Sequence, residues 1–225
     1  LSLAVRDLFQ MPVLSDLARM LGRHKEVIVP TNRITVETQH ISSDLLPLID
    51  LDQGEIDRIV SRIPGGVSNI QDIYELSPLQ DGILFHHLLA EEGDPYLLIA
   101  QLAFDDREML DRHLAAFRSV VDRHDILRTA FIWEGLSAPA QVVMRKAILS
   151  VIELELNAED GPVPEQLAER FDPRKHRINL DEAPLLRFVV ARDEANGRWV
   201  LLQLLHHLIG DHSTLEVMHE EVEAF

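Results

Sequence analysis

The fold is decided by residues 199–205, which read Trp-Val-Leu-Leu-Gln-Leu-Leu, and by residues 206–212, which read His-His-Leu-Ile-Gly-Asp-His. A nearly continuous apolar run of this length is typical of a strand that is buried on both faces of a sheet. Residues 185–191 predict a second strand, and the Asn196-Gly197 pair between the two segments favours a tight hairpin. The sequence therefore predicts a buried hairpin whose last strand ends in a cluster of titratable side chains.

Capped and amphipathic helices are predicted on both sides of this hairpin in the sequence. Ser77 precedes Pro78, and Gln80 follows three residues after Ser77, a pattern that predicts a capped helix running to about residue 90. The same capping pattern at residues 213–216 predicts a final helix to about residue 225. The remaining predicted elements are an amphipathic helix over 107–124, short helices over 54–63 and 164–171, and strands over 96–104, 127–133, 140–144 and 151–156.

The composition is that of a globular protein, since apolar residues make up 46% of the 225 residues and charged residues 26%. No apolar run approaches the roughly 18 residues that cross a bilayer. The 38 acidic residues outnumber the 21 basic ones, and the net charge of −17 argues against nucleic-acid partners and anionic membranes. The absence of cysteine excludes disulfide frameworks, cysteine-ligated zinc and thiol catalysis. Residues 1–6 lack the layout of a secretory signal, so we expect a cytoplasmic protein.

The cluster at residues 206–212 admits three interpretations. Its histidines can simply cap the strand and bond to backbone groups, as a lone histidine often does. They can hold a metal ion, with His206, His207, Asp211 and His212 as ligands, but adjacent side chains on an extended backbone point in opposite directions. In the catalytic interpretation, one histidine faces a substrate cavity, the other packs inward, and Asp211 fixes the loop by an ion pair. Four titratable groups within seven residues favour the catalytic interpretation.

These residues resemble a known family. The run at residues 206–212 is similar to the HHxxxDG motif of condensation domains of nonribosomal peptide synthetases, which are relatives of chloramphenicol acetyltransferase. All the matching motifs occur in the family's order over residues 45–225, which is more specific than any one of them. The other segments that resemble family motifs are Ser77-Pro-Leu-Gln80 with Gly82-Ile-Leu-Phe85, Arg123-His-Asp-Ile-Leu-Arg-Thr129, and Pro184-Leu-Leu-Arg187.

A second histidine pair refines the resemblance. Residues 86–94 fit the pattern HH[I/L]xxxxGD, with His86, His87, Gly93 and Asp94 at its defining positions. This pattern is similar to the one that marks the dual condensation/epimerisation subtype. An ordinary helix end is the alternative, because histidines suit a helix C-terminus and glycine ends a helix. That alternative accounts for the residue types but not for their joint spacing.

The resemblance implies an α/β fold, namely a chloramphenicol-acetyltransferase-like lobe with a mixed, largely antiparallel sheet flanked by helices. Residues 1–22 resemble the C-terminal helices of a peptidyl carrier domain, residues 23–43 have the composition of a linker, and residues 44–225 resemble the N-terminal lobe of a condensation domain. We expect this lobe to bind no metal and no cofactor of its own. The resemblance implies that the 4'-phosphopantetheine is on partner carrier domains and that its attachment serine lies outside this chain, because the carrier-like residues 1–22 lack the motif that holds it.

The partners that the resemblance implies are upstream and downstream peptidyl carrier domains, an adjacent adenylation domain and the C-terminal lobe of the condensation domain. Without that lobe we expect the chain to be inactive. The implied reaction belongs to secondary-metabolite biosynthesis. An amine on the downstream carrier attacks the thioester held by the upstream carrier and forms an amide bond.

The resemblance assigns catalytic positions to His207, His206 and Asp211. His207 is expected to orient the amine or take its proton, and in the dual subtype to act first as the base that inverts the donor residue. Asp211 is expected to form a structural ion pair with Arg123 or Arg128.

Gly210 and His212 are expected near the site. The family motif usually ends in glycine, and His212 stands at that position, where a positive φ would strain it. Two other functions stay open: a catalytically silent docking domain of the same fold, and a stand-alone acyltransferase of the coenzyme A type. The presence of His207 and Asp211 argues against the first, and the carrier-like N-terminal segment argues against the second.

Overall fold

The computed structural model describes residues 13, 15 and 31–224, and the chain divides into compact units at residues 1–31 and 32–225. The second unit contains every helix and strand named below. The predicted carrier helices of residues 1–22 lie almost entirely outside the described residues, so they stay a prediction. None of the helices in the described segments is long and apolar enough to cross a membrane.

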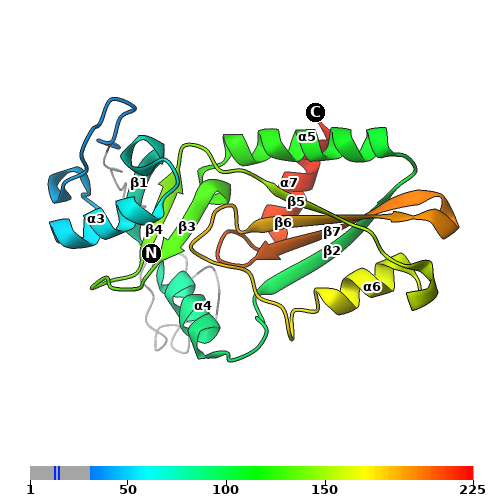
Figure 1. Cartoon of the computed structure of the whole chain (residues 1–225). Coiled ribbons are helices and arrows are strands. Elements are labelled where there is room, and N and C mark those ends of the chain that lie inside the picture. Colours follow the sequence, from blue (N-terminus) through cyan, green and yellow to red (C-terminus); the bar gives the residue numbers. More distant parts are fainter. Residues whose placement is uncertain (1–12, 14, 16–30, 225) are drawn as a thin grey trace. The chain divides into compact units, whose positions relative to one another are not determined.

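A four-stranded sheet carries the predicted hairpin (Figure 1). Strand β7 (Arg198–His206) lies between β2 (Leu97–Phe104) and β6 (Leu186–Asp193), both antiparallel to it, and β5 (Ser150–Leu154) runs parallel to β6 at the edge. The residues of β7 from Val200 to His206 are all buried, as the apolar run predicts. This sheet confirms the predicted mixed, largely antiparallel α/β fold.

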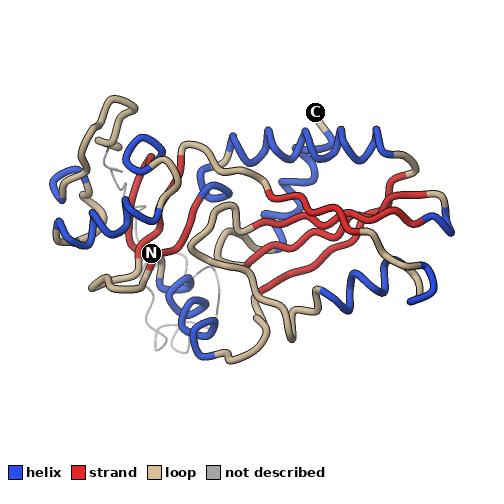
Figure 2. Tube along the Cα trace, viewed as in Figure 1, coloured by secondary structure: helices blue, strands red, loops and turns tan. Residues whose placement is uncertain are grey.

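Helices cover both faces of this sheet. Helices α5 (Arg107–Arg123) and α7 (His212–Glu223) lie together on one side, and α6 (Val163–Arg170) lies on the other (Figures 1 and 2). The apolar stripe of α5 packs on the strands through Phe117, whose ring centroid is 4.9 Å from that of Phe188 in an edge-to-face arrangement. Both rings are fully buried, so the core holds α5 on the central strands.

A smaller, three-stranded antiparallel sheet has its own hydrophobic core. Its order is β1 (Ile70–Glu75), β4 (Ala140–Met144) and β3 (Thr129–Ile132), and helix α3 (Gln53–Arg62) contributes buried isoleucines to that core. Helix α4 (Pro78–Leu89) follows β1 and leads into β2. The sequence did not predict β1, and it predicted one sheet where the structure has two.

Two predicted boundaries differ from the structure. Residues 32–43 were predicted as part of a linker, but Ile34 and Ile41 are buried in the core of the smaller sheet, so this segment packs on the second unit. The final helix begins at His212 and is capped by Asp211, two residues before the predicted cap at Ser213. Aspartate caps as well as serine does, and the carboxylate of Asp211 reaches the backbone N–H of Thr214.

Candidate active site

The loop between β7 and α7 separates its two adjacent histidines. His206, the last residue of β7, is fully buried, whereas His207 is half-buried. The backbone N–H of His207 donates to the carbonyl of Tyr96, at 2.9 Å. The ring Nδ1 of His207 lies 3.1 Å from the carbonyl oxygen of Gly210. Because a carbonyl only accepts, Nδ1 carries the hydrogen, and Nε2 of the neutral ring is then an acceptor.

The ring of His206 is fixed through both nitrogens. Its Nδ1 accepts the backbone N–H of Leu208 at 3.2 Å, so the hydrogen of the neutral ring is on Nε2, which lies 3.0 Å from Oδ2 of Asp94. Burial lowers the pKa of His206 and outweighs the opposing effect of the Asp94 carboxylate. His206 is therefore a neutral hydrogen-bond donor with a single fixed tautomer. The resemblance placed it among the catalytic residues, but a ring with no exposed surface cannot touch a substrate in this structure.

Asp94 is the buried acceptor behind this loop. Its Oδ2 also lies 2.5 Å from Nδ1 of His87, and its Oδ1 accepts the backbone N–H of Tyr96 at 2.9 Å. Burial by itself would raise the pKa of Asp94, but the hydrogen bonds from His206, His87 and the Tyr96 N–H hold it below its ordinary value. The carboxylate is thus ionised and fully hydrogen-bonded, as a buried charge requires.

The segment that leads to Asp94 passes close to the backbone of Pro173 and is held by two hydrogen bonds from Arg177. Gly93 has φ +64°, and a Cβ there would fall within 2.6 Å of the Pro173 carbonyl oxygen. The guanidinium of Arg177 donates to the carbonyls of His87 and Ala90 at the end of α4. Free carbonyls at a helix C-terminus favour a cation there, so Arg177 stabilises the end of α4.

The early motif contacts the same loop through Gln80. Ser77 and Gln80 form the predicted capping box at the start of α4. The amide Nε2 of Gln80 also donates to the carbonyl of Leu208 at 3.1 Å and to Oε1 of Gln141 at 3.0 Å. Sequence reasoning found the cap but missed this contact, and it missed Tyr96 and Arg177 altogether. The one available signal for Tyr96 was its position as the first residue of the strand predicted over 96–104.

The predicted ion pair of Asp211 is wrong. The carboxylate of Asp211 is exposed and caps α7, and its hydrogen bonds with the backbone and side chain of Thr214 lower its pKa. The buried Arg128 instead pairs with Asp125 at 2.5 Å and donates to the carbonyls of Val121 and Met144. Arg123 is exposed and lies 3.5 Å from Glu221 of α7. The helix cap satisfies Asp211 locally, so no arginine is needed behind the loop.

Gly210 and His212 flank the helix start. A Cβ on Gly210 would lie 2.6 Å from Cγ2 of Thr214, so glycine permits this close approach. His212 is the first residue of α7, with an exposed ring 3.4 Å from Glu216. In residues 31–224 only glycines have positive φ, so the histidine in place of the family's glycine is not strained.

The four ligands of the predicted metal interpretation are not brought together, because His206 is buried while Asp211 and His212 are exposed. A different trio has donor atoms within 4.8 Å of one another: His87, Asp94 and His206. A metal-bound histidine donates its other ring N–H to an acceptor. Nδ1 of His206 instead faces the N–H of Leu208, a donor. The trio therefore fits a hydrogen-bonded carboxylate better than a metal ion.

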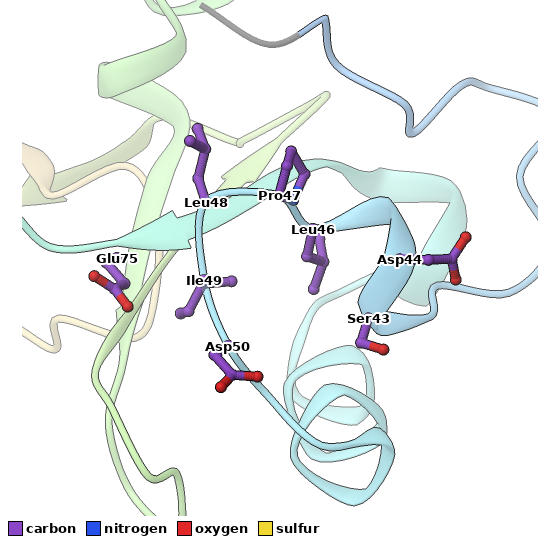
Figure 3. Close-up of a pocket in the computed structure, with 8 residues that line it drawn as sticks. All are labelled: Ser43, Asp44, Leu46, Pro47, Leu48, Ile49, Asp50 and Glu75. Carbon is purple, nitrogen blue, oxygen red and sulfur yellow. The ribbon is translucent and has the colours of Figure 1, made fainter.

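A cavity of about 560 Å³ lies elsewhere in the second unit, beside the end of β1 in the smaller sheet (Figure 3). It carries acidic side chains but no histidine, so it is separate from the chemistry of the loop. Figure 3 shows its lining residues on the segment before α3 and at the end of β1: Ser43, Asp44, Leu46, Pro47, Leu48, Ile49, Asp50 and Glu75.

Comparison with known sequences finds one family and several synthetases. The family profile described as "Condensation domain" matches residues 70–225. The chain is 60% identical to malpinin synthetase over 223 residues and 61% identical to malpibaldin synthetase over 224 residues, both from Mortierella alpina. A subunit of the linear gramicidin synthase from Brevibacillus parabrevis is 31% identical over 224 residues. These matches cover 98–99% of this chain but only 3–4% of the length of each relative.

Solved structures agree on the fold. The starter condensation domain of rhizomide synthetase RzmA superposes on 67% of this chain and 36% of its own, with a TM-score of 0.55 and 23% identity. A holo four-domain nonribosomal peptide synthetase bound to AMP and glycine covers 69% of this chain and 12% of its own, with a TM-score of 0.58 and 16% identity. At these identities the likeness shows the architecture alone.

Proposed function

The chain belongs to the condensation-domain family of nonribosomal peptide synthetases, and from that premise we propose that it supplies the histidine-bearing lobe of a catalyst that forms amide bonds between carrier-bound substrates. The acyl donor is an aminoacyl or peptidyl thioester, and the acceptor is the amine of an aminoacyl thioester. Both substrates arrive on the 4'-phosphopantetheine of peptidyl carrier domains. Holding the two reactants together supplies much of the acceleration.

The observation that carries this proposal is the orientation of His207. Its Nδ1–H is held by the Gly210 carbonyl, so Nε2 has a lone pair available to a substrate. Attack of the neutral amine forms the C–N bond and breaks the C–S bond of the thioester. The amine proton passes to Nε2 of His207, or His207 orients the amine by accepting that hydrogen, and the thiolate leaves with a proton.

The remaining predicted catalytic residues take supporting roles in this proposal. His206 is buried behind the loop and Asp211 caps α7, so each acts by positioning the loop that carries His207. The proposed assembly includes the upstream and downstream carrier domains, an adenylation domain and the C-terminal lobe of the condensation domain. Residues 1–22 are proposed to be the end of a carrier domain, and the synthetase is proposed to work in the cytoplasm.

The experiment uses the synthetase that contains this chain, with both carriers loaded. His207→Ala is expected to give no dipeptidyl carrier above the uncatalysed background while both carriers stay loaded, as mass spectrometry of the carriers would show. His40→Ala removes an exposed imidazole outside the loop and is expected to leave product formation intact. Product at the normal level with His207→Ala would refute the assignment. A wild-type synthetase that makes no product would favour the silent docking domain.

We also propose that the site inverts the donor residue before condensation. The presence of all four defining residues of the second histidine motif, His86, His87, Gly93 and Asp94, supports this proposal. A thioester acidifies the neighbouring Cα–H, so a base such as His207 can remove that proton and an acid can return one to the other face. With an L-residue loaded as donor, the product should have the D configuration at that residue. An L,L product would show that the site forms the amide bond without inverting the donor residue.

A further inference from the structure

We propose that residues 86–94, the histidine-motif segment, act as a positioning brace for the loop that carries His207, through the carboxylate of Asp94. This inference rests on the proposed function, because its first test measures the rate of peptide formation. Asp94 and His87 then position the loop for any reaction at His207, and neither one exchanges protons with a substrate.

The carboxylate of Asp94 is buried, and both of its oxygens accept hydrogen bonds. The Asp94 side chain and that of His206 have no exposed surface, and the His87 side chain is 8% exposed. Each carboxylate oxygen of Asp94 accepts a hydrogen bond. Oδ2 accepts from Nδ1 of His87 and Nε2 of His206, and Oδ1 accepts from the backbone N–H of Tyr96. A carboxylate enclosed in this way cannot reach a substrate, but it can fix the groups that donate to it.

Two chains of hydrogen bonds lead from Asp94 to the two peptide units that flank the Cα of His207, and they end on the backbone N–H groups of His207 and Leu208. In the first, Asp94 orients His206, and Nδ1 of that ring accepts the N–H of Leu208. In the second, Asp94 accepts the N–H of Tyr96, whose carbonyl accepts the N–H of His207. The backbone of His207 is therefore held from both neighbouring peptide units by one buried charge.

The spacing of the motif follows from this arrangement. His87 lies in the last turn of α4, and the chain must turn back within a few residues to bring Asp94 against its ring. Gly93 permits the turn because its φ is +64° and its backbone lies against that of Pro173. The backbone N–H of Asp94 then donates to the Pro173 carbonyl at 2.7 Å. A helix end alone would need neither the close approach nor the carboxylate.

His86 differs from its neighbour. Its ring is exposed and stacks on Tyr96, with Nδ1 2.7 Å from the Tyr96 hydroxyl. It supports the same segment from the surface without touching Asp94. The two histidines of the motif therefore have separate roles, and only His87 belongs to the buried brace.

The first test is a double-mutant cycle on the loaded synthetase. Asp94→Asn keeps the shape and removes the charge, and we expect kcat for peptide formation to fall roughly 10–100-fold with KM for the donor carrier within about twofold, because a small misplacement of a reacting group is costly. In a His206→Gln background, the same change should cost less than about threefold, because the asparagine oxygen still accepts the Tyr96 N–H and the chain that the change breaks runs through His206. The D to L ratio of the donor residue should be the same in Asp94→Asn and in His206→Gln.

Asp193→Asn is the matched control. Asp193 is another buried carboxylate, held by Asn196 and Arg198 at the opposite end of β7, and we expect its loss to leave kcat unchanged. An equal fall in kcat for Asp193→Asn would overturn the proposal, as would additive effects of Asp94→Asn and His206→Gln. A D to L ratio that changes in Asp94→Asn but not in His206→Gln would assign proton transfer to Asp94 and also overturn it, because a loss of loop position affects both variants.

The second test needs no activity and does not depend on the folding of a variant. Nitrogen NMR of the wild-type chain at neutral pH should show His206 as the Nε2–H tautomer, with Nδ1 shifted as a hydrogen-bond acceptor. A His206 ring with the hydrogen on Nδ1, or one that exchanges between tautomers, would overturn the brace. If the wild-type synthetase makes no product while this tautomer is observed, the proposed function fails and the brace stands.

Discussion

Replacing Gly93 by alanine tests the close approach on which the position of Asp94 depends. Gly93 has φ +64° and Gly197, in the β6–β7 hairpin, has φ +66°, so the two glycines share one backbone conformation. A Cβ on Gly197 would meet nothing within 4 Å. A Cβ on Gly93 would lie 2.6 Å from the Pro173 carbonyl oxygen and closer still to that of Arg174. The pair Gly93→Ala and Gly197→Ala therefore separates crowding from backbone strain.

The magnitudes follow from these contacts. Left-handed strain costs an alanine about 1–2 kcal/mol at either position. At Gly93 the Cβ must also retreat to the ordinary contact distance of 3.4 Å from two carbonyl oxygens, that of Pro173 at 2.6 Å and the still closer one of Arg174, so the backbone shifts by about 1 Å. That shift breaks the 2.7 Å bond from the Asp94 N–H to the Pro173 carbonyl, and leaving buried groups unpaired costs about 1–3 kcal/mol more. We expect Gly93→Ala to lose about 2–5 kcal/mol and Gly197→Ala about 1–2 kcal/mol.

Urea unfolding of the chain, followed by circular dichroism, measures both losses. The expected result is a lower midpoint for Gly93→Ala than for Gly197→Ala, with the same dependence on urea concentration. Losses that agree within about 0.5 kcal/mol would contradict this prediction, because crowding would then contribute nothing at Gly93.

Three further predictions concern the loop and the core. Gln80→Leu removes the bond to the Leu208 carbonyl and is expected to lose about 1–3 kcal/mol in urea unfolding and to slow peptide formation; an unchanged rate would show that this bond does not hold the loop. Arg128→Leu leaves buried carbonyls unpaired and should cost about 2–4 kcal/mol in the same assay, against less than about 1 kcal/mol for the exposed Arg123→Leu, and equal losses would contradict the buried role. Burial lowers the pKa of His206 from 6.5, so its contribution to stability is complete above about pH 6.5 and is lost as the pH falls toward the folded pKa. The free energy of unfolding should decline from pH 7 to about pH 5 and decline less in His206→Gln; the same slope in both would contradict this.

Local patterns predicted most of the elements of the second unit. The apolar run at 199–205 became β7, the Asn196-Gly197 pair lies in the turn between β6 and β7, and the capping box at Ser77 starts α4. These features depend on neighbours in the sequence, which a single sequence displays. Strand β1 was missed because residues 70–75 mix polar and apolar side chains without regular alternation.

The sequence identified the residues of the site but not the hydrogen bonds and ion pairs between them. His206 and Asp94 are 112 positions apart, and only the pairing of β2 with β7 brings them together. The ion pair of Asp211 was predicted wrongly because its motif does not show that a helix cap satisfies the carboxylate first. Contacts that depend on strand pairing or on a close approach of two backbone segments leave no local pattern in the sequence. Only the structure shows them.

The single-turnover rate of peptide formation on preloaded carriers, measured for His207→Ala, shows whether His207 acts on the amine. A side chain that takes or positions the reacting proton contributes typically 10²–10⁴-fold, so we expect a fall of at least about 100-fold, with loading and binding of both carriers unchanged. A rate within about threefold of the wild type would contradict the claim that His207 acts on the amine.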